Sequence, residues 1–123
     1  MIKLVLSDLD STLLWQGDRH IATPFALEAI HALQDAGVHF APATGRIYRD
    51  LDVMFAGDSR AYSTAVTSNG QLVYLDGELV DSTPMAREGL EGVRHALADV
   101  PDAYLVVEYS GQKMAVDAPL DFE

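Results

Sequence analysis

One stretch near the N-terminus decides the fold of this chain: KLVLSDLDSTLL, at residues 3–14. The apolar residues 2–6 have the length and the branched side chains expected of a buried parallel strand. Polar residues follow at once, with Asp8 and Asp10 one position apart and Thr12 after them. In open α/β sheets the chemistry takes place just beyond the carboxyl ends of the strands. These three polar side chains therefore mark a candidate site.

The spacing of Asp8 and Asp10 favours a divalent cation at this site. In an extended chain alternate side chains point the same way, so the two carboxylates would share one side. Two carboxylates at such a short distance repel each other, and the pKa of one of them rises unless a cation lies between them. Mg²⁺ is the natural cation for one or two carboxylates plus a phosphate. Taken alone, the motif also fits a polar turn after a strand, because short patterns match by chance.

The composition indicates a globular domain and excludes several classes of function. The chain has 123 residues, 49% of them hydrophobic, which is enough for one domain with a modest core. Its formal net charge of −11 argues against nucleic acid and anionic membranes, whose binding requires basic patches. The absence of cysteine excludes disulfides, thiolate catalysis and cysteine-bound zinc. No apolar stretch suffices for a signal peptide or a membrane span, so a soluble, cytoplasmic protein is expected.

A helix and a second strand are predicted after the first motif. Thr23 is a good N-cap, and Pro24 suits the first helical position. Apolar residues then recur at helical spacing until Gly37, which favours a helix end. Residues 38–43 indicate a second buried strand. The strand–helix–strand unit has the length of a parallel crossover.

The second strand also ends in residues that suit a phosphoryl group. They are Thr44, Gly45 and Arg46, and a helix is predicted from Ile47 onward. Backbone N–H groups and the dipole at a helix N-terminus attract phosphoryl oxygens. The alternative is a plain strand-to-helix turn with an exposed arginine. We favour the phosphate site, because polar motifs follow two successive strands.

A third strand is predicted over residues 61–67, followed by Ser68, Asn69 and Gly70. The sequence Asp76-Gly77 then separates two apolar runs, which is typical of a hairpin with a primed turn. For Asn69 alone a tight turn that uses Asn-Gly for its backbone freedom is almost as good an interpretation.

The pattern changes at Thr83. Thr83 and Pro84 are expected to begin a helix, and two strands follow over residues 103–109 and 112–116. This helix–strand–strand order differs from the strand–helix order that precedes it.

The three strand-end motifs together resemble those of the haloacid dehalogenase (HAD) superfamily, in its branch of Cof-type sugar phosphatases. The resemblance implies an α/β fold: a partial Rossmann-like core with three parallel strands at residues 1–82, then the start of an inserted α+β cap domain at residues 83–123. The matching residues are Asp8, Asp10 and Thr12 after the first strand, Thr44, Gly45 and Arg46 after the second, and Ser68, Asn69 and Gly70 after the third.

The resemblance also implies roles for the first motif. Asp8 would attack phosphorus and form an aspartyl-phosphate, and Asp10 would protonate the leaving oxygen and later activate water. Thr12 would hold the loop. Mg²⁺ would bind the side chain of Asp8 and the main-chain carbonyl of Asp10.

The other two motifs would bind the substrate. Thr44 would contact the transferring phosphoryl group, and Gly45 would let the backbone approach it. Arg46 would contact substrate or phosphate, and Asn69 would lie beside the phosphate site. The implied substrate is a small phosphorylated metabolite, and sugar phosphates, flavin mononucleotide and pyridoxal phosphate all remain open.

The resemblance covers only the first part of the family's pattern. Its third motif is a lysine near the nucleophile, but Lys3 lies at the wrong end of the first strand and Lys113 in the presumed cap. Its fourth motif, an acidic metal-binding pair, is not matched either, and Asp58 is interpreted as a loop residue. We therefore expect the N-terminal portion of a longer phosphatase, which self-associates or pairs with a C-terminal portion.

Two alternatives remain. A degenerate module of the same fold would bind a phosphorylated ligand or a partner chain without turnover. An unrelated α/β protein would use the acidic residues differently. A response-regulator receiver carries its phosphorylated aspartate after a later strand, and no Gly-x-Gly-x-x-Gly follows the first strand as in dinucleotide-binding folds.

Overall fold

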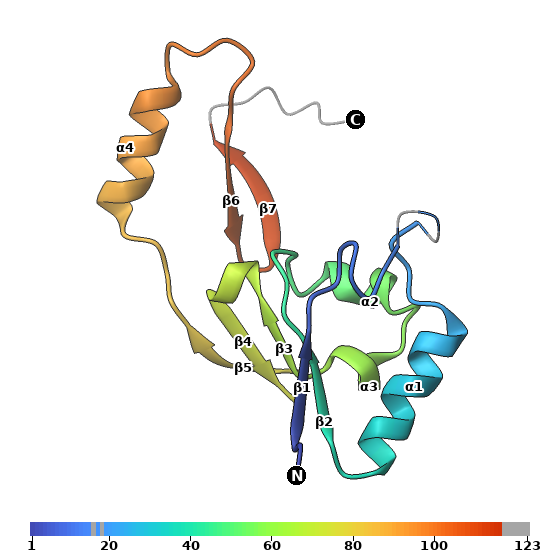
Figure 1. Cartoon of the computed structure of the whole chain (residues 1–123). Helices are drawn as coiled ribbons and strands as arrows, with labels where there is room; N and C mark the ends of the chain where they lie inside the picture. Colours follow the sequence, from blue (N-terminus) through green and yellow to red (C-terminus); the bar gives the residue numbers. More distant parts are fainter. Residues whose placement is uncertain (16, 18, 117–123) are drawn as a thin grey trace. The chain divides into compact units, whose positions relative to one another are not determined.

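The computed structural model describes residues 1–15, 17 and 19–116 (Figure 1). The chain divides into two compact units, Met1–Thr83 and Pro84–Glu123. Within the described residues no helix has the length and apolar character that crossing a membrane requires.

The first unit is built on a parallel strand pair joined by a helix. Strand β1 (Leu4–Ser7) pairs with β2 (His39–Pro42), with Leu4 opposite His39 and Ser7 opposite Pro42. Helix α1 (Pro24–Asp35) connects them. The predicted N-cap is confirmed, since Thr23 Oγ1 accepts a hydrogen bond from the Ala26 amide at 3.2 Å. The parallel pair brings the residues that follow β1 and β2 to one end of the sheet.

The third predicted strand is shorter than expected. Residues Ser59–Tyr62 form helix α3, and β3 begins only at Ala65 and ends at Thr67. Ala61 and Tyr62 are buried, as a strand would require, but they are buried from a helical turn. Their apolar character therefore did not distinguish the two structures.

The expected sheet of three parallel strands is not confirmed. Strand β3 pairs with Ala43, the residue after β2, through a single isolated parallel bridge, and the Thr44 amide donates to the Val66 carbonyl at 2.9 Å. Strand β3 instead forms an antiparallel sheet with β4 (Leu72–Leu75) and β5 (Glu78–Ser82). The parallel ladder in the described part of the chain thus contains β1 and β2 alone.

The hairpin of β4 and β5 confirms the predicted primed turn. Asp76 and Gly77 have φ angles of 51° and 86°, the positive values that such a turn requires. The Gly77 amide donates to the Ser63 carbonyl at 2.8 Å, which ties the turn to the segment after α3. The Tyr74 ring of β4 stacks on Tyr48, with ring centroids 3.8 Å apart.

The core of the first unit lies between the β1–β2 pair and the helices, including α2 (Asp50–Met54). Helix α2 begins three residues after the expected start at Ile47. The loop that follows β1 contributes to this core, because Leu9 and Leu14 are almost fully buried. The buried side chains that form this core cluster are Leu9, Leu14, Ala22, Ile30, Phe40, Leu51, Met54, Phe55, Ala61, Tyr62 and Ala65.

The second unit has the predicted order of helix, strand and strand. Helix α4 (Arg87–Leu97) begins four residues later than the expected start at Thr83. Strands β6 (Leu105–Tyr109) and β7 (Gln112–Val116) form an antiparallel hairpin, with Leu105 opposite Val116. No residue of α4 is buried.

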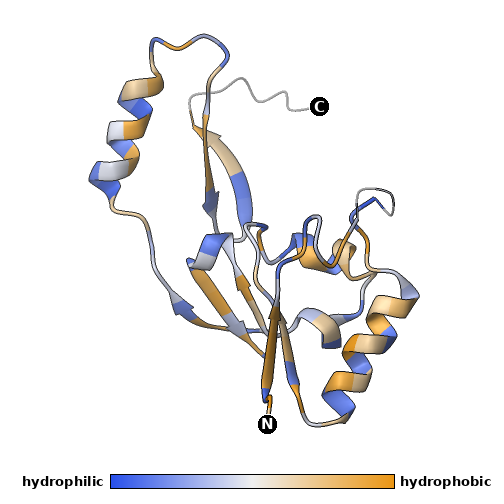
Figure 2. Cartoon of the chain, in the orientation of Figure 1, coloured by the Kyte–Doolittle hydropathy of each residue, from blue (hydrophilic) through white to orange (hydrophobic). Residues whose placement is uncertain are grey.

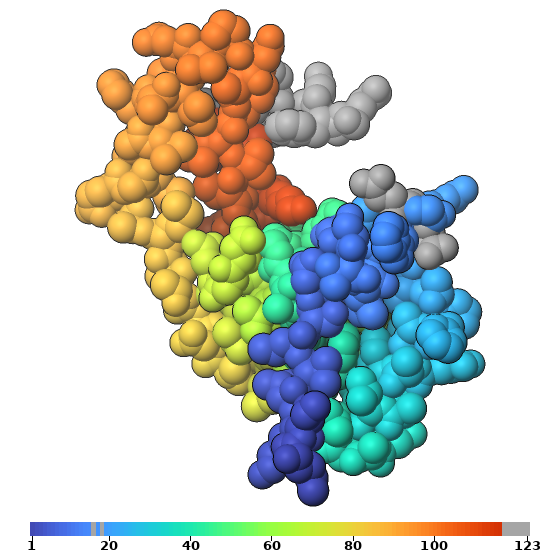
Figure 3. Space-filling view, viewed as in Figure 1, coloured from blue at the N-terminus to red at the C-terminus, as the bar shows by residue number. Residues whose placement is uncertain are grey.

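Strand β1 forms an edge of its sheet and is exposed there. It pairs only with β2 in the part of the chain that the structure describes. Ile2, Leu4 and Leu6 are 71%, 50% and 55% exposed. Figure 2 shows β1 as an almost continuously hydrophobic strand, and Figure 3 shows it at the surface of the first unit. Natural edge strands usually contain a charged residue, a proline or a bulge. In residues 2–7 Lys3 is the one such feature.

We predict that the 123-residue chain self-associates through β1 as its concentration rises. Leu6→Lys should weaken the association about tenfold or more, because burying a leucine side chain contributes about 1.5–3 kcal/mol. Sedimentation velocity over a concentration series measures this. Leu79→Lys is the control, since Leu79 is a similarly exposed leucine of β5, at 52%.

A chain that stays monomeric at its highest attainable concentration would contradict this prediction. So would equal weakening by the two substitutions, because the effect would then come from net charge rather than from the edge of β1.

Candidate active site

The loop after β1 is held in place by its buried leucine. Leu9 is fully buried, while Asp8 before it is exposed and Asp10 after it is partly exposed. The Leu9 carbonyl accepts hydrogen bonds from the amides of Thr12 at 3.1 Å and Leu14 at 2.9 Å. The alternation that buries Leu9 places the two carboxylates on the accessible side of the loop.

Asp8 is oriented by Thr12. The Thr12 hydroxyl donates to Asp8 Oδ2 at 2.8 Å. Thr12 was expected to hold this loop, and its contact is with the side chain of Asp8 itself. Within the described residues this is the hydrogen bond that the Asp8 carboxylate accepts, so its other oxygen is available to a ligand.

The residues after β2 form a second side of the site. Thr44 is 7% exposed, and its hydroxyl oxygen accepts a hydrogen bond from the Arg46 amide at 3.1 Å. The hydroxyl proton of Thr44 is then available for donation to another oxygen. This arrangement suits an anionic oxygen near Thr44.

Asn69 joins the residues after β2 to those after β3. The Asn69 amide donates to the Thr44 carbonyl at 3.2 Å, and the Ser68 amide donates to the Arg46 carbonyl at 3.0 Å. A Cβ atom at Gly45 would lie 2.8 Å from Asn69 Oδ1, which only glycine avoids. Asn69 has a φ of 58°, in the left-handed region that asparagine tolerates.

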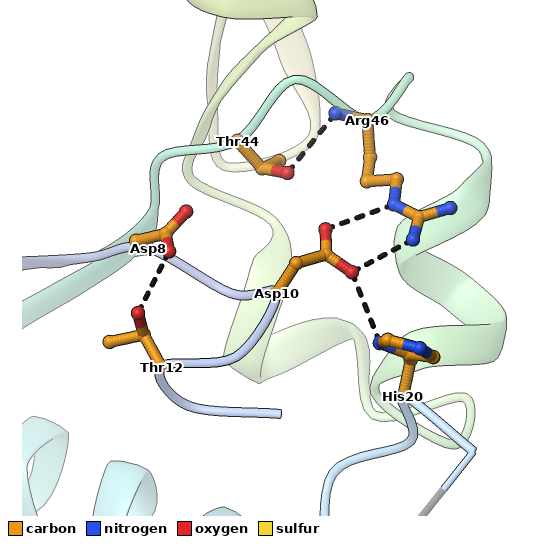
Figure 4. A network of polar contacts seen from close by, with 6 residues as sticks. All are labelled: Asp8, Asp10, Thr12, His20, Thr44 and Arg46. Atoms are coloured by element: carbon orange, nitrogen blue, oxygen red, sulfur yellow. Dashed lines mark hydrogen bonds and ion pairs between the residues drawn. The ribbon is translucent and has the colours of Figure 1, made fainter. Parts of the chain in front are cut away.

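Arg46 connects the second loop to the first. Its Nε donates to Asp10 Oδ2 at 3.0 Å and its Nη2 to Asp10 Oδ1 at 2.8 Å (Figure 4). These hydrogen bonds are the main reason why the pKa of Asp10 lies below its ordinary value, against the opposing effect of partial burial. The same contact raises the pKa of Arg46. Asp10 is therefore ionised in this arrangement.

His20 is a neighbour of Asp10 that the sequence did not reveal. Its Nδ1 lies 3.1 Å from Asp10 Oδ1 and its side chain is 34% exposed. The one available signal was its position in the loop that follows the first motif. A histidine in a loop is usually solvated, so only the course of that loop places it here.

The negative charges of Asp8 and Asp10 have different partners. Arg46 neutralises Asp10, so the repulsion that the spacing suggested does not by itself require a cation between the two side chains. A metal ion would take the free oxygen of Asp8 and the main-chain carbonyl of Asp10. In the described ranges no three acidic or histidine side chains are grouped closely enough to hold a metal. The oxygen donors suit Mg²⁺ in kind but would leave most of its six positions to water and phosphate.

The fold is shared with several solved structures, among them phosphatases. A phosphatase of the HAD superfamily from Bacteroides thetaiotaomicron, BT1666, is 22% identical, with a TM-score of 0.76 over 94% of this chain and 41% of the other. A hypothetical protein from Geobacillus kaustophilus is 26% identical, with a TM-score of 0.71 over 97% of this chain and 45% of the other.

A third structure carries a narrower description. The HAD subclass IIB sugar phosphatase BT4131 is 22% identical, with a TM-score of 0.63 over 77% of this chain and 36% of the other. This chain therefore spans less than half the length of all three structures. No curated protein matches it.

The family is established over nearly the whole sequence. Residues 5–119 match the family model of the haloacid dehalogenase-like hydrolases. The match includes the three polar segments that meet around Asp10, Arg46 and Asn69. The chain belongs to the haloacid dehalogenase-like hydrolase family.

Proposed function

We propose that the first unit carries the phosphoryl-transfer site of a Mg²⁺-dependent phosphatase for small phosphorylated metabolites, sugar phosphates among them. The reaction would pass through an aspartyl-phosphate. One observation supports this above the others: hydrogen bonds join the polar residues that follow β1, β2 and β3. Arg46 contacts Asp10, and Asn69 contacts Thr44.

In this proposal Asp8 is the nucleophile. Its free carboxylate oxygen would attack phosphorus, while the bond from phosphorus to the leaving oxygen breaks. Thr12 holds the other oxygen of Asp8, which fixes the direction of the attacking one. Phosphoryl transfer depends mostly on such positioning and on charge stabilisation.

Asp10 would move the protons of the reaction. It would give a proton to the leaving oxygen in the first step and take one from the attacking water in the second. The contact with Arg46 suits the second role, because a lowered pKa keeps the carboxylate ionised. To act as an acid, Asp10 has to be released from Arg46 first.

The transferring phosphoryl group would lie against Thr44, Gly45 and Asn69. The Thr44 hydroxyl has a proton to donate, and Gly45 has no side chain to keep the phosphoryl group away from the backbone. Mg²⁺, held by the Asp8 carboxylate and the Asp10 carbonyl, would neutralise charge on the phosphoryl oxygens.

The alternative is a module of the same fold that binds a phosphorylated ligand or a partner chain without turnover. The positions of the two lysines favour it. Lys3 precedes β1, at the end of the strand opposite Asp8, and Lys113 lies in β7 of the second unit. The described residues of the first unit therefore place no lysine beside Asp8.

Trapping of the aspartyl-phosphate separates these two functions. After incubation with acetyl phosphate and Mg²⁺, borohydride reduction should convert Asp8 to homoserine, which peptide mass spectrometry detects. Asp8→Asn should abolish this product. Asp58→Asn is the matched control, because Asp58 pairs with His31 at 2.7 Å and is not part of the site.

A product at another aspartate would contradict the assignment of Asp8. Saturable phosphate binding without any trapped product would favour the non-catalytic module.

A second prediction concerns the ionisation of Asp10. Arg46→Gln removes the hydrogen bonds that lower its pKa, so the pKa should rise towards the ordinary aspartate value of about 3.9. Because the native pKa is depressed, the contribution of the contact to stability is present above about pH 4 and is lost as pH falls through the native pKa. A carbon-detected NMR titration of the Asp10 carboxyl measures the shift.

Asp35 supplies the internal reference for this titration. Its pKa is lowered by Arg60, not by Arg46, and should stay unchanged in the variant. An unchanged Asp10 pKa would show that Arg46 does not pair with it in solution.

A further inference from the structure

A cavity of about 460 Å³ in the first unit has a basic lining, and two of its arginines, Arg19 and Arg49, have no role in the proposed chemistry. Arg19, His20, Arg46 and Arg49 all line it. The chain has a net charge of −11 and only eight lysines and arginines, so three of those eight meet in this one cavity. Such a concentration against the overall charge indicates an anionic ligand.

The remaining lining gives the cavity an apolar part and one opposing charge. Ile21, Val53 and Met54 supply the apolar surface, and Asp50 is its acidic residue. The charge of Asp50 acts on Arg46 and adds to the effect of Asp10 on its pKa. Arg19 and Arg49 are exposed, so their guanidinium groups can move towards a ligand.

The cavity adjoins the proposed proton donor. Arg46 and His20, which line it, are also the two residues that contact the Asp10 carboxylate. In Figure 4 Asp10 lies between Asp8 on one side and these two residues on the other. A leaving group protonated by Asp10 would therefore extend towards the cavity and away from Asp8.

We propose that this cavity binds a second anionic group of the substrate, so that the preferred substrates are phosphate monoesters that also carry a carboxylate or a second phosphate. The direction of the leaving group rests on the proposed function. Arginine side chains bind both kinds of anion through paired hydrogen bonds, and three are present.

The same anion would compete with Asp10 for Arg46. A phosphate or carboxylate in the cavity accepts the hydrogen bonds that Asp10 accepts in its absence. Its binding thus releases the Asp10 carboxylate, which is the condition for Asp10 to donate a proton. A substrate with two anionic groups would promote its own reaction in this way.

Calorimetric titration of the 123-residue chain at low ionic strength, with Mg²⁺ present, tests the proposal. Fructose 1,6-bisphosphate is compared with fructose 6-phosphate, and 3-phosphoglycerate with glycerol 3-phosphate. The first member of each pair should bind about tenfold more tightly or better, because hydrogen bonds between arginine and an anion are stronger than those between neutral groups. If the tighter binding is seen in just one of the two pairs, that pair identifies whether a phosphate or a carboxylate is the second group.

Arg49→Gln and Arg19→Gln should each remove most of the preference and leave the affinity for fructose 6-phosphate unchanged. Arg60→Gln is the control with the same change in net charge, since Arg60 pairs with Asp35 on another surface of the same unit. It should keep the preference.

Equal affinities within both pairs would overturn the proposal. So would undetectable binding of both fructose 1,6-bisphosphate and 3-phosphoglycerate. A preference that both arginine variants keep would overturn it as well. The Asp8→Asn chain should retain the preference, because the measurement needs no turnover. Failure of the proposed function therefore shows in the trapping experiment, and failure of this inference shows in the affinities.

Discussion

The contact between Arg46 and Asp10 is the interaction on which the site depends. It joins the loop after β1 to the loop after β2 through two hydrogen bonds of 2.8 and 3.0 Å. Only a parallel strand pair brings these two loops to the same end of the sheet, and only the burial of Leu9 directs Asp10 outward. The contact neutralises one of two nearby carboxylates and holds Asp10 ionised. The contact therefore links the two loops. It also keeps Asp10 in the ionised form, which has no proton to donate.

Short sequence patterns predicted the parts of the fold that depend on neighbouring residues alone, namely a helix cap and a tight turn. The N-cap at Thr23 and the turn at Asp76 and Gly77 follow from side-chain hydrogen bonding and backbone freedom, and both were confirmed. Burial does not determine the type of element, and residues 61–62 were therefore wrongly assigned to a strand. The contacts of Arg46 with Asp10 and of His20 with Asp10 span 36 and 10 positions, and no local pattern predicts such pairs.

Composition likewise described the molecule but not its site. A net charge of −11 argued against polyanionic partners, and it gave no sign of three arginines around one cavity. Local charge depends on which loops meet, and here the loop after β1 meets the segment before α2. A small anionic substrate and an acidic protein are compatible because the field near the site is set by the nearest charges.

The central claim is that Asp8 accepts a phosphoryl group beside Thr44 and Asn69. Beryllium fluoride binds a nucleophilic carboxylate as a mimic of the aspartyl-phosphate, and amide NMR spectra locate it without any turnover. With Mg²⁺ present, the account predicts shifts of the Asp8, Thr44 and Asn69 amides that are absent from the Asp8→Asn chain. Shifts that survive this substitution, or that lie away from these three residues, would contradict it.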